Sequence, residues 1–68
     1  MNPERAEQAD RFIVDYLQEH AYPPSVRELA DHLQVTKSTA HRVLTELVLL
    51  GWYERDGNRP RALRRVRP

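Results

Sequence analysis

The sequence predicts a mainly α-helical fold that ends in a small β-hairpin. Apolar residues recur with helical spacing in three segments of the first fifty residues. Prolines or helix-capping residues separate these segments, and after Gly51 the pattern changes to short extended runs around the turn-forming stretch 56–60. A chain of 68 residues has room for one compact core, so we expect a single domain over residues 1–68.

The first helix is expected over about residues 3–21. Asn2 can cap it, Pro3 suits the first helical position, and Glu4 favours the positive end of the helix dipole. The two prolines at 23 and 24 then stop the helix. Its predicted apolar stripe follows the i, i+3, i+4, i+7 rule and consists of Ala6, Ala9, Phe12, Ile13, Tyr16, Leu17 and His20.

Two further helices are expected over about residues 26–33 and 37–50. Ser25 and Glu28 have the spacing of a capping box at the start of the shorter one, and Thr36 is the favoured cap of the longer one. Gly51 tolerates a left-handed conformation and is a natural C-terminal stop. Their predicted buried positions are Val26, Leu29, Ala30 and Leu33, and then Ala40, Val43, Leu44, Leu47, Val48 and Leu50.

The segment after Gly51, over about residues 52–66, is expected to form a hairpin, which we call the wing. Residues 52–55 favour one strand and residues 61–66 its return, with a turn between them. Trp52 and Leu63 are expected to pack on the core, and the tip is left for solvent or a partner.

Composition excludes several classes of function. There is no cysteine, so neither a disulfide scaffold nor a thiolate metal site is available. His20, His32 and His41 lack metal-ligand spacing, and no Gly-rich phosphate loop or Ser/His/Asp arrangement occurs. We therefore expect no catalytic residue, no metal and no cofactor. The charged N-terminus and the short apolar run 47–50 indicate a cytoplasmic protein with no membrane partner.

Charge is distributed unevenly along the chain. Residues 1–51 carry five Lys/Arg against eight Asp/Glu, a net charge of −3, and residues 52–68 carry six Arg against two acids, a net charge of +4. A basic end either meets a polyanion or is simply a solvated tail, and charge alone does not separate the two.

The spacing of the second and third helices carries the functional prediction. Only two or three residues separate them, as in a helix-turn-helix, whose second helix presents its first residues to base edges. With the hairpin this predicts a winged helix-turn-helix. The residues expected to contact DNA are Ser25, Arg27, Thr36, Lys37, Ser38, Thr39, His41, Arg42, Thr45, Arg55, Arg59 and Arg61.

Each residue type suits a part of DNA. Arg42 can pair with guanine O6 and N7, whereas Lys37 and Arg27 suit phosphates. Ser25 could donate its hydroxyl or its backbone N–H to the same strand, although a plain helix cap is the simpler role. The third helix could also show an ordinary solvent face, but Glu46 is the only acid between Asp31 and Glu54.

The segments 22–30 and 36–44, followed by Leu47, Leu50 and Gly51, resemble the DNA-binding domain of LexA-type repressors, as does the wing ending 59–63. The resemblance covers roughly residues 8–66. It implies a winged helix-turn-helix and operator recognition by the third helix. LexA-type repressors also contain a self-cleaving, dimerising peptidase domain, for which this sequence gives no support.

The sequence therefore predicts a sequence-specific regulator of transcription, of the repressor type, with double-stranded DNA as its partner. A single module makes a small interface, so a homodimer is a further expected partner, and Leu49, Tyr53 and apolar parts of the first helix could supply its surface. Two alternatives stay open, namely a winged-helix protein adaptor and a non-specific architectural DNA binder.

Overall fold

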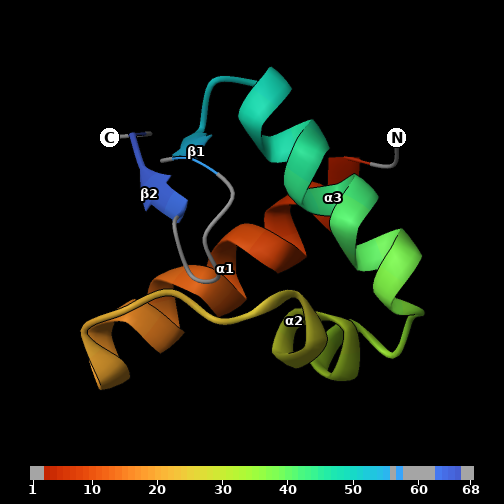
Figure 1. The fold of residues 1–68 in the computed structure, drawn as a ribbon, viewed down its shortest axis with the longest axis horizontal. Coiled ribbons are helices and arrows are strands. Elements are labelled where there is room, and N and C mark those ends of the chain that lie inside the picture. The colour runs from red at the N-terminus through yellow and green to blue at the C-terminus, as the bar shows by residue number, and fades with distance from the viewer. Residues whose placement is uncertain (1–2, 56, 58–62, 67–68) are drawn as a thin grey trace.

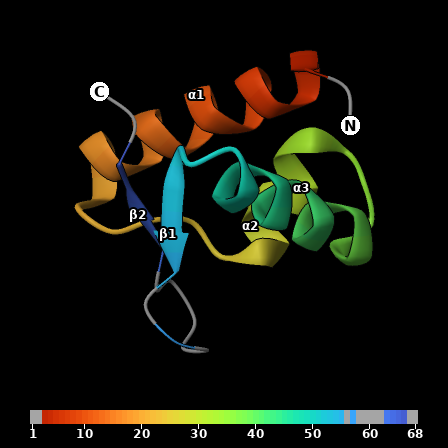
Figure 2. The ribbon, with the colours of Figure 1, turned by 90° about the horizontal axis from the view of Figure 1, so that it is seen from above.

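The computed structural model describes residues 3–55, 57 and 63–66. Helices α1 (Pro3–His20), α2 (Val26–Leu33) and α3 (Lys37–Leu49) are followed by strands β1 (Tyr53–Arg55) and β2 (Leu63–Arg65) (Figure 1). Figure 2 shows α1 along one side of the molecule, with α2 and α3 across from it and the hairpin beside α3. The predicted fold of three helices plus an antiparallel hairpin is confirmed.

The second and third helices begin at the predicted caps. The Ser25 hydroxyl accepts the Glu28 N–H at 3.2 Å, and the Glu28 carboxylate accepts the Ser25 N–H at 2.8 Å, which completes the capping box. The Thr36 hydroxyl accepts the Thr39 N–H at 3.1 Å. These bonds fix where the two helices start relative to the turn between them.

All three helices are followed within two residues by a residue in the left-handed conformation. Ala21 has a φ of 63°, Gln34 of 58° and Gly51 of 79°. Because Ala21 leaves the helical conformation, α1 ends at His20, one residue earlier than expected. The α3 helix likewise ends at Leu49 rather than at residue 50.

The ends of α2 and α3 share one hydrogen-bond pattern. At the end of α3, the Gly51 N–H donates to the Val48 carbonyl and the Trp52 N–H to the Leu47 carbonyl, which is a Schellman motif. At the end of α2, the Gln34 and Val35 N–H groups repeat this pattern. Glycine occupies the left-handed position in one motif and glutamine in the other, so the tight turn after α2 forms without a glycine.

The core lies where the three helices meet. Its largest fully buried side chains are Ile13 from α1, Leu29 from α2, Val43 and Leu47 from α3, and Tyr53 from β1. Smaller residues complete it, namely Ala6, Ala9, Ala30, Ala40 and Leu44.

Two predictions at the edge of the core are wrong. Leu50 is 47% exposed, although it keeps a helical conformation as the C-cap of α3. Tyr53, expected on a dimer surface, is 1% exposed and belongs to the core, since the alternation of β1 turns it inward. Trp52 and Leu63 pack against the core as expected and are partly buried.

The register of the hairpin places one cross-strand pair of side chains on each of its two faces. Tyr53 lies opposite Arg65 and Glu54 opposite Arg64. Glu54 and Arg64 form an ion pair on the solvent face. Residues directly opposite each other on paired antiparallel strands project to the same face, so Tyr53 and Arg65 both face the helices.

A buried carboxylate joins the hairpin to the first helix. Asp10 of α1 is 7% exposed, and it accepts a hydrogen bond of 2.6 Å from the Tyr53 hydroxyl. The Arg65 guanidinium reaches both of its oxygens, with Nε at 3.1 Å and a terminal nitrogen at 3.3 Å. We call Asp10, Tyr53 and Arg65 the Asp10 cluster. It connects α1 to both strands, which lie 43 and 55 residues further along the chain.

The Asp10 cluster predicts a specific loss of stability in alkali. Burial, and then the Asp10 carboxylate, raise the pKa of Tyr53 well above its ordinary value of 10. The folded state therefore favours the protonated phenol, and its contribution is complete below about pH 10 and lost as the pH rises further. In denaturant unfolding at pH 8, Tyr53→Phe should lose about 1.5–3 kcal/mol, and this deficit should shrink between pH 10 and 12.

Asp10→Asn is the control for that measurement. It removes the carboxylate but keeps a buried phenol, so it should be destabilised at pH 8 and still lose stability above pH 10. Wild-type and Tyr53→Phe curves that run parallel up to pH 12 would contradict the role given to the phenol.

Candidate nucleic-acid interface

The segment from α2 to α3 forms a helix-turn-helix. The turn consists of residues 34–36, with Gln34 left-handed and Thr36 extended as the cap of α3. Leu29 and Ala30 of α2 are buried together with Ala40 and Leu44 of α3. This packing leaves the other side of the first turns of α3 facing solvent.

The exposed face of α3 contains the residues that the sequence singled out. Those that are exposed are Thr36, Lys37, Ser38, His41, Arg42 and Thr45, and Thr39 is half-buried. The first turn of α3 has no acidic residue. The structure therefore brings the predicted residues of this helix to one face, which is polar and basic.

The three threonines have internal hydrogen bonds. The Thr36 hydroxyl donates to the Thr39 hydroxyl at 3.1 Å besides accepting its N–H, and the Thr45 hydroxyl donates to the His41 carbonyl at 3.0 Å. Through these bonds, the threonine hydroxyls help to maintain the structure of the helix. Among the described residues of α3, the longer donors of this face are Lys37, His41 and Arg42.

Four residues of this face line a shallow hollow with one residue of α2. The hollow has a volume of about 540 Å³ and is lined by Val26, Lys37, Ser38, His41 and Arg42. Val26, which is partly buried against the core, is the apolar member. Sequence reasoning placed Val26 on the buried side of α2 and did not connect it with the DNA-binding face, because only the crossing of the two helices brings it there.

The start of α2 is held by hydrogen bonds to its own cap and to α1. Glu28 accepts the Ser25 N–H and a 2.6 Å bond from the Tyr16 hydroxyl of α1. The backbone N–H of Ser25, which the sequence offered as a phosphate donor, is therefore occupied, and that part of the prediction is wrong. Its hydroxyl oxygen accepts the Glu28 N–H, which leaves the hydroxyl proton for an outside acceptor. Arg27 is exposed beside it.

The arginines of the wing are not equivalent. Arg55 is exposed at the end of β1, and Arg59 and Arg61 lie outside the described residues. Arg65 is paired with Asp10, and this hydrogen bond raises the pKa of its guanidinium further. Arg64 is paired with Glu54. The sequence could not show which arginines pair with a carboxylate, because this pairing depends on which face of each strand is turned towards α1.

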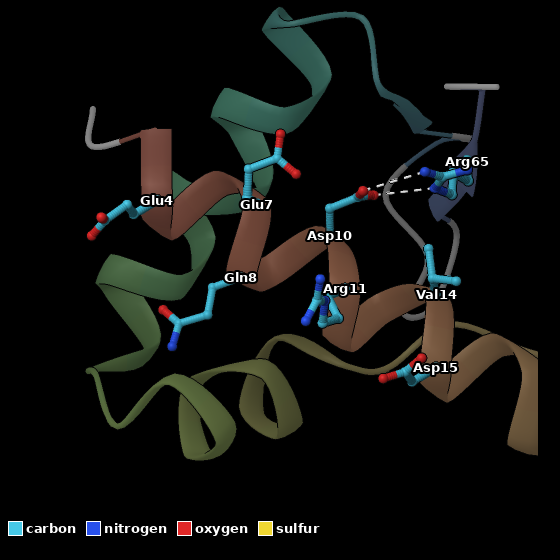
Figure 3. A pocket seen from close by; sticks show the side chains of 8 residues that line it. All are labelled: Glu4, Glu7, Gln8, Asp10, Arg11, Val14, Asp15 and Arg65. Carbon is cyan, nitrogen blue, oxygen red and sulfur yellow. Dashed lines mark hydrogen bonds and ion pairs between the residues drawn. The ribbon is translucent and has the colours of Figure 1, made fainter.

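The outer surface of α1 has the opposite electrostatic character. A groove of about 790 Å³ runs along it, lined by Glu4, Glu7, Gln8, Asp10, Arg11, Val14, Asp15 and Arg65. Figure 3 shows Arg65 on β2 and the other side chains projecting from α1, with Asp10 turned towards Arg65. The excess of carboxylates makes this groove unfavourable for a polyanion, so the basic face of α3 is the better candidate.

The histidines of the helices have separate surroundings. The His32 ring is stacked on Phe12 at 4.1 Å, and the His20 ring lies 4.1 Å from that of Tyr16. His41 is at the hollow. Within the described residues, no three metal-ligating side chains gather into a group that could hold an ion. In the same part of the chain, no helix is long and apolar enough to cross a membrane.

Three helices, a helix-turn-helix and an antiparallel hairpin define a winged helix-turn-helix domain. Residues 13–57 match the family described as the IclR helix-turn-helix domain, and the chain belongs to that family. It is thus a DNA-binding domain of the kind found in transcriptional regulators.

Curated relatives are LexA repressors, which confirms the resemblance seen in the sequence. Identity is 40% over 53 residues to that of Thermotoga neapolitana, covering 78% of this chain and 27% of the relative. The LexA repressor of Thermotoga maritima is 39% identical over 61 residues, which cover 90% of this chain and 31% of the relative. The LexA repressor of Carboxydothermus hydrogenoformans is 39% identical over 56 residues, which cover 81% of this chain and 28% of the relative. The chain thus spans about three tenths of the length of these relatives.

The position of Thr36 predicts that its effect on stability comes from capping. Thr36→Ala should lower the free energy of unfolding by about 1 kcal/mol, because the Thr39 N–H loses its acceptor. Thr36→Ser keeps the hydroxyl oxygen and should restore most of that loss. Urea unfolding of the two variants measures both effects, and an equal loss in the two would show that the hydroxyl is not the group that matters.

Proposed function

We propose that this domain binds specific sequences of double-stranded DNA and acts as a repressor of transcription. The first two turns of α3 enter the major groove, and the wing rests on the sugar–phosphate backbone or in the adjacent minor groove. The observation that carries the proposal is the exposed face of α3, which is rich in hydrogen-bond donors and has no acid in its first turn.

Direct reading of bases is assigned to three residues of that face. Arg42 can donate two parallel hydrogen bonds to O6 and N7 of guanine, and His41 and Ser38 can contact neighbouring base edges or phosphates. Their rigid helical spacing places Ser38 and Arg42 on one line, one turn apart. Thr36, Thr39 and Thr45 contribute by holding this helix end in shape and by their methyl groups.

Contacts with phosphates are assigned to the flanks of the helix. Arg27 and Lys37 lie near the starts of α2 and α3, where the positive end of each helix dipole also favours an anion. Arg55 continues this basic surface onto the wing, and Arg59 and Arg61 extend it along the sequence. Arg65 is excluded from this group because the buried Asp10 carboxylate already pairs with it.

We also propose that two copies of the domain bind together on the DNA. One small module covers only about 600–1,000 Å² of protein surface on DNA, so strong specific binding needs two. Of the residues expected at a dimer surface, Tyr53 is withdrawn into the core, whereas Leu49 is 75% exposed. The relatives are named repressors, and the repressor sense is transferred from them as part of this proposal.

Salt dependence tests whether DNA is the partner. If roughly four to six basic groups meet phosphates, log K should fall with log salt at a slope of about −4 to −5, measured by fluorescence anisotropy. A selected duplex pool, read for symmetry and spacing of half-sites, identifies the preferred site. No binding of random duplex at micromolar protein and low salt would contradict the proposal and favour a protein adaptor. Binding without any sequence preference would favour an architectural role.

Arg42→Ala tests the role of α3 in specificity. It should weaken binding to the preferred site by about 1–3 kcal/mol and relax the preference at one base pair. Arg11→Ala, an exposed arginine in the groove of α1, is the matched control and should leave binding unchanged. Equal losses on every duplex would instead make Arg42 a phosphate contact.

A further inference from the structure

The hollow at the start of α3 contains one rigid apolar side chain among four polar ones. Lys37, Ser38, His41 and Arg42 come from α3, and Val26 is the first residue of α2. Val26 is partly buried, so one side of it packs on the core while the other side faces the hollow. The hollow therefore offers an uncovered apolar surface in the middle of the candidate DNA-binding face.

The position of Val26 is fixed more tightly than that of its long neighbours. A β-branched side chain in a helix has essentially one rotamer, so its two methyl groups are held in place. The capping box at Ser25 and Glu28 fixes the backbone immediately before it. Arg42 and Lys37, by contrast, have long flexible stems. The apolar wall of the hollow is thus formed before any ligand arrives.

An apolar wall of this kind favours contact with a small apolar group on a base. Valine can neither donate nor accept a hydrogen bond, so it contributes nothing to phosphate binding or to the polar edges of bases. The major groove contains one apolar group, the 5-methyl of thymine, and apolar side chains are its usual contacts. Methylation of cytosine places a methyl at the same ring position.

We propose that Val26 makes the hollow a contact site for the 5-methyl group of a pyrimidine in the recognised sequence, while the surrounding donors of α3 read the polar edges. This inference rests on the proposed binding of DNA by this face. It adds a residue of α2 to the residues that determine specificity, and it makes binding sensitive to a methyl group at one position of the site.

The test removes only methyl groups from the DNA. In the preferred duplex, each thymine is replaced in turn by deoxyuridine, and each cytosine in turn by 5-methylcytosine. For the wild-type domain, deoxyuridine should weaken binding about fourfold at one position of each half-site. If the preferred base there is cytosine, 5-methylcytosine should strengthen binding by a similar factor. Val26→Ala should abolish this difference, and Val26→Ile should retain it.

Two controls separate this contact from other effects. Val14→Ala, a partly buried valine in the groove of α1, should keep the full sensitivity to the methyl group. The salt slope should be unchanged in Val26→Ala but reduced by about one in Arg27→Ala.

The outcomes also separate the two proposals. Wild-type binding with no position sensitive to the methyl group overturns the inference and leaves DNA binding intact, as does a sensitivity that survives in folded Val26→Ala. If the wild-type domain binds no duplex at all, the proposed function fails and the inference fails with it.

Discussion

The architecture depends on the Asp10 carboxylate. A hairpin of two three-residue strands has little stability of its own and needs a surface to pack on. Here Tyr53 supplies the buried side chain and Asp10 the hydrogen-bond acceptor beneath it. An unpaired buried carboxylate would be strongly unfavourable, and the phenol and the Arg65 guanidinium both stabilise it. One interaction thereby orients the wing relative to α1 and, through the core, relative to α3.

The Asp10 cluster also decides which charges remain for a partner. It removes Arg65 from the charges available to a partner, whereas Arg64 stays exposed beside Glu54 on the solvent face. The remaining carboxylates of α1 give the outer groove an acidic character, whereas α3 begins with no acid at all. The molecule is therefore electrostatically two-sided although its net charge is only +1. Such an arrangement orients a domain on a polyanion as well as attracting it.

The helix-turn-helix gains its precision from local hydrogen bonds. Ser25 and Thr36 determine where α2 and α3 start, and left-handed Gln34 sets the turn between them. Tyr16 ties the same capping glutamate to α1, so the start of α2 is held from two sides. The hollow follows from this geometry, because it forms where the first residue of α2 meets the first turns of α3. A DNA-binding face with both donors and a fixed apolar wall can distinguish base pairs by shape as well as by hydrogen bonds.

The sequence by itself determined the three helices, their caps, the short turn and the polar face of α3, because these depend on residues within one or two turns of each other. Ser25 with Glu28, Thr36 with Thr39, and Gly51 are all signals of this local kind. Only the tertiary structure decided that Tyr53 is core rather than surface, that Arg65 is neutralised, and that Val26 lines the hollow. Each of these outcomes depends on contacts between different elements. The alternation of a strand or the apolar stripe of a helix does not indicate which other element will pack against it. The physical reason is that burial and charge pairing are set by how elements pack, whereas helix periodicity and capping are set along the chain.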